Sequence, residues 1–250
     1  MEFVSRTDVG KIREENQDSA CAFVHNGFLI GIVADGMGGH NGGAQASKMA
    51  VDCVKAYLLE QLCIDDDADA VIKYLHGAYA QATEMIFARA QKETELRGMG
   101  TTLTVALLRD GKAIVSNIGD SRAYLFDGEL KQLTVDQTWV QHLIDSGEIT
   151  REQAKTHPHR HVILKAVGTE AEVVPEIYTA DVTGKTILLC SDGLSGEVED
   201  VQLKEILGMQ KDLAQTADIM ISCANAVGGE DNITVVLLCE KSKRNYTVKG

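Results

Sequence analysis

Three tight-turn dipeptides constrain the fold of this chain more than any other feature of its sequence. Each stands between two strand-like runs, and they are Asn26-Gly27, Asp110-Gly111 and Asp127-Gly128. Such pairs tolerate the positive φ angles of short hairpin loops. The turns therefore predict antiparallel β-sheet, and two later apolar runs, 186–190 and 232–239, are also strand-like.

Helical patterns separate these strand-like runs. Residues 44–62 and 67–96 carry apolar side chains at steps of three and four, which is typical of amphipathic helices. Shorter helices are expected at 138–146, 201–207 and 213–226. Helices between the early strands and again between the late ones favour an arrangement with helices packed outside a two-sheet core.

The composition limits the classes of protein that the chain can belong to. A formal net charge of −13 argues against a general nucleic-acid binder, because nothing would offset phosphate repulsion. No apolar run approaches the ~18 to 20 residues of a membrane span, and no signal peptide is recognisable. Six scattered cysteines without a C-x-x-C pair indicate reduced core thiols, hence a cytoplasmic location. No linker or repeat divides 1–250, so one domain is expected.

Five aspartates stand at the ends or edges of apolar strand-like runs. Asp35 follows the run 28–34, and five glycines lie in the eight residues after it. The others are Asp120 and Asp192 just after a strand, Asp231 just before one, and Asp18 before the first strand. Turn chemistry explains any single aspartate beside glycine. Turn chemistry is a poor explanation for five aspartates that all stand at strand ends.

Converging carboxylates cannot all stay ionised and unpaired, because mutual repulsion raises their pKa values. Hard divalent ions such as Mg²⁺ or Mn²⁺ would relieve that repulsion. The bare backbone after Asp35 would let a carbonyl reach a metal and a substrate approach. Metals held close together lower the pKa of a bridging water and stabilise charge on phosphoryl oxygens. Arg13 is the nearby cation that could bind phosphate; the alternative is a surface pair with Glu14 or Glu15.

Several familiar catalytic motifs are missing from the sequence. There is no C-x5-R loop, G-x-x-x-x-G-K-[ST], G-x-S-x-G or H-E-x-x-H. A metal-activated water therefore fits better than a nucleophilic side chain. A dinucleotide cradle after Asp35 is disfavoured, because G-x-G-x-x-G is absent and the carboxylate would repel the pyrophosphate.

Eight segments in order along the chain resemble the metal-dependent serine/threonine protein phosphatases, the PPM or type 2C family, in their compact bacterial form. They are "TDVGKIREENQD", "VADGMGGH", "GMGTTL", "NIGDSRAYL", "LTVDQTWV", "SGEITREQAKTHP", "LLCSDGL" and "EDNITVVL", between residues 7 and 238. The resemblance implies an α+β fold, a four-layer α-β-β-α sandwich of two antiparallel sheets flanked by helices. It also implies hydrolysis of phosphoserine and phosphothreonine on proteins, by a metal-bridging hydroxide that attacks phosphorus in line.

The same resemblance assigns residues and cofactors. It implies two main Mn²⁺ or Mg²⁺ ions and a third, weaker one. The residues it implies are Asp35 bridging two metals, Gly36 giving a backbone carbonyl, Asp192 and Asp231 on the first metal, Asp18 on the second, Asp120 with Asp192 on the third, and Arg13 on substrate phosphate. Residues of about 147–168 match a flap beside the site.

The chain departs from its relatives at two places. Met37 stands where many eukaryotic relatives have a histidine proposed as general acid; His40 is then either the acid or a support for its loop. In the flap, "RHVILK" replaces the asparagine and arginine common around "RNVLTR". His157, His159 and His161 there are interpreted as solvated side chains, the alternative being a metal cluster.

Two rival functions and the partners complete the expectations. One rival is a pseudophosphatase that only binds partners; the other is a metal-dependent hydrolase of small phosphate esters. Phosphorylated proteins, including a serine/threonine kinase and its targets, are the expected partners of a monomer, with no nucleic acid and no membrane. The basic segment 240–250 is either a tail or an added edge strand.

Overall fold

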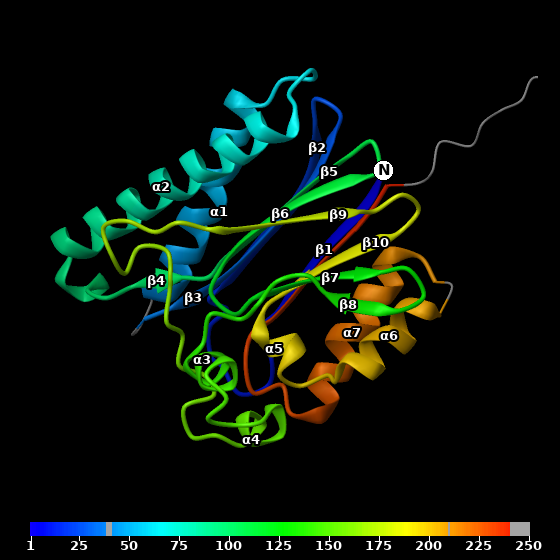
Figure 1. Ribbon diagram of the computed structural model, residues 1–250. Helices are drawn as coiled ribbons and strands as arrows, with labels where there is room; N and C mark the ends of the chain where they lie inside the picture. The colour runs from blue at the N-terminus through cyan, green and yellow to red at the C-terminus, as the bar shows by residue number, and fades with distance from the viewer. Residues whose placement is uncertain (39–41, 210, 241–250) are drawn as a thin grey trace, which may run out of the picture.

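Two antiparallel β-sheets stack face to face in the computed structural model, which describes residues 1–38, 42–209 and 211–240 (Figure 1). The first sheet contains, in spatial order, β1 (Glu2–Asp8), β11 (Ile233–Cys239), β10 (Thr186–Cys190), β7 (Arg122–Phe126) and β8 (Leu130–Gln132). The second contains β2 (Asp18–His25), β3 (Phe28–Met37), β5 (Leu103–Arg109), β6 (Lys112–Ile118) and β9 (Glu176–Asp181), with β4 (Gly100–Thr101) paired to β3.

Helices cover both outer faces of the two sheets. The elements α1 (Gly42–Gln61) and α2 (Ala68–Lys92) lie on the second sheet, whereas α6 (Asp200–Gly208) and α7 (Leu213–Val227) lie on the first (Figure 1). The short helices α3 (Trp139–Asp145), α4 (Arg151–Lys155) and α5 (Asp192–Ser195) complete the set, with a 3₁₀ turn η1 (Thr94–Leu96). The expected α+β, four-layer α-β-β-α sandwich is confirmed.

The alternation of side chains along β3 explains the layering. Ile30 and Ile32 pack against the α1–α2 layer, while Leu29 and Val33 point into the space between the sheets. Successive strand residues face opposite sides of a sheet. Because both faces of β3 are covered, this strand is a continuous apolar run up to Ala34 and not an alternating one.

The hairpin prediction is confirmed at all three turns, with one difference. At Asn26-Gly27 and Asp110-Gly111 both residues have positive φ, 45° and 80° in the first turn, 49° and 76° in the second. At the third turn only Gly128 has a positive φ, 102°. Its hairpin joins β7 to β8 all the same, so glycine alone supplies the unusual backbone conformation there.

Other elements differ from the sequence-based expectations. The helix expected over 67–96 ends at Lys92, because Glu93 is extended (φ −107°, ψ 107°) and turns the chain so that Leu96 is buried in the core. The strands β1 and β9 and the helices α4 and α5 were not expected. β1 buries only Val4 and β9 no residue fully, so neither has an apolar run. The segment 241–250 lies outside the described residues, as does His40.

Candidate active site

Five aspartates from both sheets gather at one end of the sandwich. Asp18 and Asp35 are register partners on β2 and β3. The other three lie where strands end or begin: Asp120 after β6, Asp192 as the first residue of α5 after β10, and Asp231 just before β11. All four other carboxylates act electrostatically on Asp35, so the predicted convergence is present in the structure.

Two of these positions differ in detail from the expectation. Asp18 does not precede the first strand; it opens β2, and β1 comes before it. Asp35 does not end its strand, because β3 continues to Met37 and pairs there with β4. The backbone of Asp35 is therefore fixed on one side by Thr102, whose hydroxyl accepts a hydrogen bond from the Asp35 amide at 2.9 Å.

Burial and mutual repulsion change the acidity of these groups. Burial is the main cause that raises the pKa of Asp18 to about 7, and the charges of Asp192 and Asp231 add to it, against hydrogen bonds from Thr234 and Ser191. Burial, followed by neighbouring carboxylates, also raises the pKa of Asp35 and of Asp120 well above the usual range. Without compensating charge this end of the molecule favours protonated carboxyls.

Asp192 behaves differently from its neighbours. Burial raises its pKa, but the nearby side chains of His161 and Asp35 outweigh burial and lower it overall. The pKa of Asp35 is therefore shifted above the ordinary range and that of Asp192 below it, as happens when acidic groups lie close together in different surroundings.

The donor set fits a hard divalent cation. One carboxylate oxygen each of Asp18, Asp120 and Asp192 is buried without a hydrogen-bond partner. Buried polar atoms normally have partners, and carboxylate oxygens are the preferred ligands of Mg²⁺ and Mn²⁺. Within the described ranges, no group of three acidic, thiol or imidazole side chains has the arrangement needed to hold a metal ion. Two of the five carboxylates face basic side chains instead.

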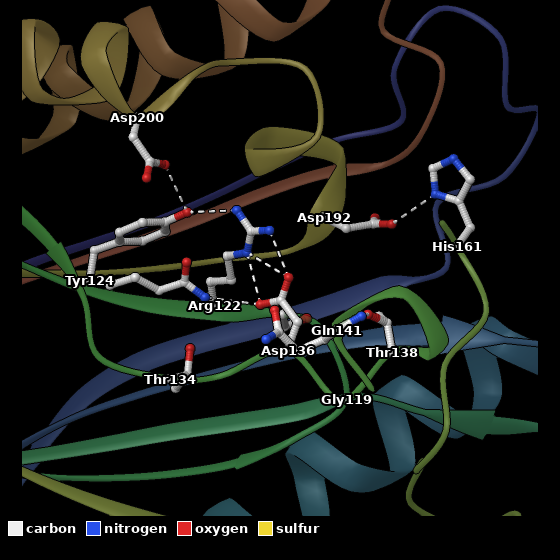
Figure 2. A network of polar contacts seen from close by, with 12 residues as sticks. Gly119, Arg122, Tyr124, Thr134, Asp136, Thr138, Gln141, His161, Asp192 and Asp200 are labelled. Carbon is white, nitrogen blue, oxygen red and sulfur yellow. Dashed lines mark hydrogen bonds and ion pairs between the residues drawn. The ribbon is translucent and has the colours of Figure 1, made fainter. Parts of the chain in front are cut away.

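Those basic side chains are Arg13 and His161. The Nη2 atom of Arg13 lies 2.7 Å from Oδ2 of Asp231, and its Nε donates to the carbonyl of Glu230 at 3.3 Å. Arg13 therefore pairs with Asp231, and the alternative of a surface pair with Glu14 or Glu15 is wrong. His161 Nδ1 lies 3.9 Å from Oδ2 of Asp192 (Figure 2). The nearby carboxylate of Asp192 is the main cause that raises the pKa of His161.

The interpretation of the flap histidines is only partly right. The side chain of His161 is 66% exposed to solvent, yet it points to an aspartate of the site. His157 and His159 contact each other, with ring centroids 5.6 Å apart. Among the described residues the three histidines do not form a metal cluster.

Gly36 has no space for a side chain. A Cβ atom at this position would collide with the carbonyl oxygens of Gly43 and Gln17. The Gly36 amide donates to that same Gln17 carbonyl at 3.1 Å. The backbone of the Asp35-Gly36 pair can therefore approach the first turn of α1 closely.

Two polar residues that the sequence interpretation did not single out support the site. Ser191 is fully buried, and its hydroxyl donates to Oδ2 of Asp18 at 2.7 Å. Asn232 fixes the loop that carries Arg13: its amide donates to the carbonyls of Val9 and Glu15, and its Oδ1 accepts from the Gln17 amide at 2.8 Å. Each of these two residues stands next to a predicted aspartate in the chain. This adjacency is the only feature of the sequence that could have identified them as part of the site.

A pocket of about 590 Å³ opens beside Arg13. It is lined by Ile12, Arg13, Gly228 and Glu230, and Asp231 follows directly in the chain. The acidic end of the sandwich thus adjoins an open space large enough for part of a ligand. None of the described helices combines the length and the apolar character needed to cross a bilayer.

Comparisons with known proteins identify the family of this chain. The family model described as protein phosphatase 2C matches residues 12–237. The serine/threonine phosphatase stp of Listeria monocytogenes is 39% identical over 248 residues, covering 98% of this chain and 96% of the relative. Serine/threonine phosphatase Stp1 from Staphylococcus aureus has a solved structure that superposes with a TM-score of 0.91 at 31% identity, covering 96% of this chain and 94% of that one.

A third comparison bears on the metal. The catalytic domain of the serine/threonine protein phosphatase PstP, solved in complex with two manganese ions, matches with a TM-score of 0.81 and 37% identity, covering 94% of this chain and 96% of that chain. The sandwich and its acidic end define a metal-dependent protein phosphatase, a hydrolase. The chain belongs to the protein phosphatase 2C family, and within it to the serine/threonine phosphatases.

Proposed function

We propose that this enzyme hydrolyses phosphoserine and phosphothreonine on proteins at the acidic end of the sandwich. The observation that carries the proposal is the gathering of five aspartates from both sheets, three with buried oxygens that lack hydrogen-bond partners. Two Mn²⁺ or Mg²⁺ ions and a third, weaker ion would neutralise this charge. When bound, such ions lower the pKa of water and supply the hydroxide that attacks phosphorus in line.

Each residue of the site has a proposed role in holding the ions. Asp35 and the backbone carbonyl of Gly36 would hold the main ions, Asp192 and Asp231 would hold the first of them, and Asp18 the second. Asp120 and Asp192 would hold the third. The supporting observations are the register pairing of Asp18 with Asp35 and the buried unpartnered oxygens.

Arg13 is proposed to orient the substrate phosphate. A guanidinium pairs with two phosphate oxygens at once. Its pairing with Asp231 keeps it at the rim of the site beside the 590 Å³ pocket. We propose that substrate phosphate takes the place of the Asp231 carboxylate as the partner of Arg13, which leaves Asp231 to a metal. His40 stays a candidate for the acid that protonates the leaving hydroxyl.

The wider context is proposed from the relatives. The partners are phosphorylated proteins, among them a serine/threonine kinase and its targets, and the enzyme acts as a monomer. Residues 1–250 form one catalytic domain with a flap at about 147–168. All six cysteines are free thiols, which supports the cytoplasm as the place of action.

Two measurements on the purified chain test this proposal. Calorimetric titration with Mn²⁺ should show binding, which a pseudophosphatase need not do. With Mn²⁺ present, kcat/KM for a phosphoserine peptide should exceed that for p-nitrophenyl phosphate. A higher value for p-nitrophenyl phosphate would favour a hydrolase of small phosphate esters. No Mn²⁺ binding together with no turnover would overturn the proposal.

A further inference from the structure

The side chain and backbone of Gln137 join the segment before Asp120 to the base of the flap. The Gln137 amide donates to the carbonyl of Gly119 at 3.0 Å, and its Oε1 accepts from the Gly119 amide at 3.0 Å. Gln137 thus binds both polar backbone groups of the residue that precedes Asp120. It is 8% exposed, so these hydrogen bonds lie away from solvent.

Gly119 can take part in this contact only because of its backbone conformation. Its φ is +100°, a value that favours glycine. A Cβ atom there would come within 2.8 Å of Cβ of Thr102. Thr102 in turn binds the backbone of Asp35, through its hydroxyl at 2.9 Å and its amide at 2.8 Å. The contact with Gln137 therefore continues to the backbone of a second aspartate of the site.

The same short segment also closes the flap at its base. The carbonyl of Gln137 accepts from the Leu164 amide at 2.8 Å, and the Trp139 amide donates to the carbonyl of Val162 at 2.8 Å. Val162 follows His161, whose ring lies beside Asp192 (Figure 2). One residue, Gln137, thus contacts the aspartate loop on one side and the end of the flap, at Leu164, on the other.

Neighbouring contacts hold this segment in place. Asp136 receives three hydrogen bonds of 2.6 to 3.0 Å from Arg122, the second residue after Asp120 (Figure 2). The far end of the Gln137 side chain is anchored as well, because Nε2 donates to Oε1 of Glu176 on β9 at 3.0 Å. Glu176 also accepts from the hydroxyl of Tyr178 at 2.5 Å.

We propose that Gln137 is a positioning residue, which through Gly119 and Leu164 holds Asp120 and the base of the flap in one fixed arrangement. The proposal deepens the proposed function, since it relies on Asp120 as a metal-binding residue. It makes two measurable claims. Disturbing the Gln137–Glu176 contact should weaken Mn²⁺ binding that depends on Asp120, and it should weaken binding of a phosphopeptide beside the flap.

The test exchanges the two partners. Gln137→Glu places a carboxylate against Glu176. The constant to follow is the Mn²⁺ dissociation constant that Asp120→Asn also changes. We expect Gln137→Glu to raise this constant about tenfold, the scale of a buried polar group that loses its partner. KM for a phosphoserine peptide should rise by a similar factor, with KM for p-nitrophenyl phosphate little changed. The double variant Gln137→Glu with Glu176→Gln restores both hydrogen bonds and should return both constants to within about twofold.

A matched control is available on α3. Gln141 donates from Nε2 to Oδ1 of Asp145 at 2.8 Å, in an exposed pair on one helix. Gln141→Glu therefore also places a carboxylate against an acidic partner, but away from the hydrogen bonds to Gly119, and should change neither constant. If Gln137→Glu fails to fold, Glu176→Ala removes the anchor at an exposed edge-strand residue, together with the contact from Tyr178, and should raise both constants by a smaller factor.

The outcomes separate this inference from the proposed function. Wild-type constants in a folded Gln137→Glu or Glu176→Ala variant, even with a lower Tm, would overturn it, because Gln137 would then be structural only. A folded double variant that stays impaired would overturn it too. If Asp120→Asn changes no Mn²⁺ constant, the metal role of Asp120 fails, and the peptide KM values still decide the role of Gln137.

Discussion

Asp18 and Asp35 face each other as register partners on neighbouring antiparallel strands, and both belong to the acidic end of the sandwich. Directly opposed like charges destabilise a strand pair. Here the pair lies beside three further carboxylates and is partly buried, so the repulsion is stronger than on an open surface. The opposed carboxylates therefore lower the stability of the folded protein at this position, which is a common property of sites that bind ions.

Replacing the central carboxylate should abolish most of the activity. We expect Asp35→Asn to lower kcat on a phosphoserine peptide by about two to three decades, the scale of a lost preorganised electrostatic group. The measurement is steady-state kinetics with Mn²⁺. Asp127→Asn is the control, since Asp127 lies in a turn, where its carboxylate pairs with Lys185 at 3.4 Å and accepts from the Glu129 amide at 3.4 Å. Near-normal turnover of Asp35→Asn would remove this aspartate from the site.

The stability of the metal-free protein should fall as pH rises. The pKa of Asp18 is about 7 in the folded protein against 3.8 for an ordinary aspartate, so the folded state holds a proton that the unfolded state has lost. This contribution is complete below pH 4 and is lost between pH 4 and 7.

Thermal unfolding in EDTA, compared with Asp18→Asn, measures this effect. The asparagine variant lacks the titrating group, so the difference in Tm between the two proteins should change across that pH window. Added Mn²⁺ should raise Tm more at pH 8 than at pH 5, since the ion binds ionised carboxylates. A constant difference would show that Asp18 titrates normally.

Loss of the arginine at the rim should affect catalysis and not stability. Arg13→Ala should lower kcat/KM for the phosphopeptide about ten- to a hundredfold, the range for hydrogen bonds to a charged group. Arg13→Lys should recover only part of it, since a lysine cannot pair with two oxygens at once. Arg6→Ala, which breaks a surface pair with Asp218, is the matched control and should have full activity.

The buried serine next to Asp192 should matter for stability and for ion binding. Ser191→Ala removes the donor to Asp18 and leaves the Thr234 amide, now bonded to the serine hydroxyl at 3.0 Å, without that partner. We expect a loss of about 1–3 kcal/mol in the free energy of unfolding and weaker Mn²⁺ binding. Chemical denaturation and calorimetry measure these. Ser222→Ala on the exposed face of α7 should change neither.

Much of the fold was readable along the chain because it depends on short-range patterns. The Asn26-Gly27 and Asp110-Gly111 turns set positive φ angles locally, and the strands beside them follow from that geometry. The apolar steps of 44–62 correspond to α1 within two residues at its start and one at its end. β1 was missed because its place depends on the distant β11, with which it pairs along its whole length.

The candidate site divides in the same way. The resemblance and the strand-end pattern named the aspartates and Arg13. No local pattern could show that Arg13 pairs with Asp231, 218 residues away, or that His161 faces Asp192. Gln137 was also invisible as a site element, because its partners Gly119, Leu164 and Glu176 come from three separate segments.

The amino-acid sequence by itself determined the two antiparallel sheets, the helices outside them and the set of acidic residues at strand ends, since turn preference and side-chain periodicity act over a few neighbouring residues. Only the tertiary structure decided in which direction the pKa of each carboxyl group shifts, which basic side chain faces which aspartate and which polar residue connects the flap to the segment before Asp120. Those properties depend on burial and on distances between segments far apart in the chain, and these exist only once the two sheets have packed.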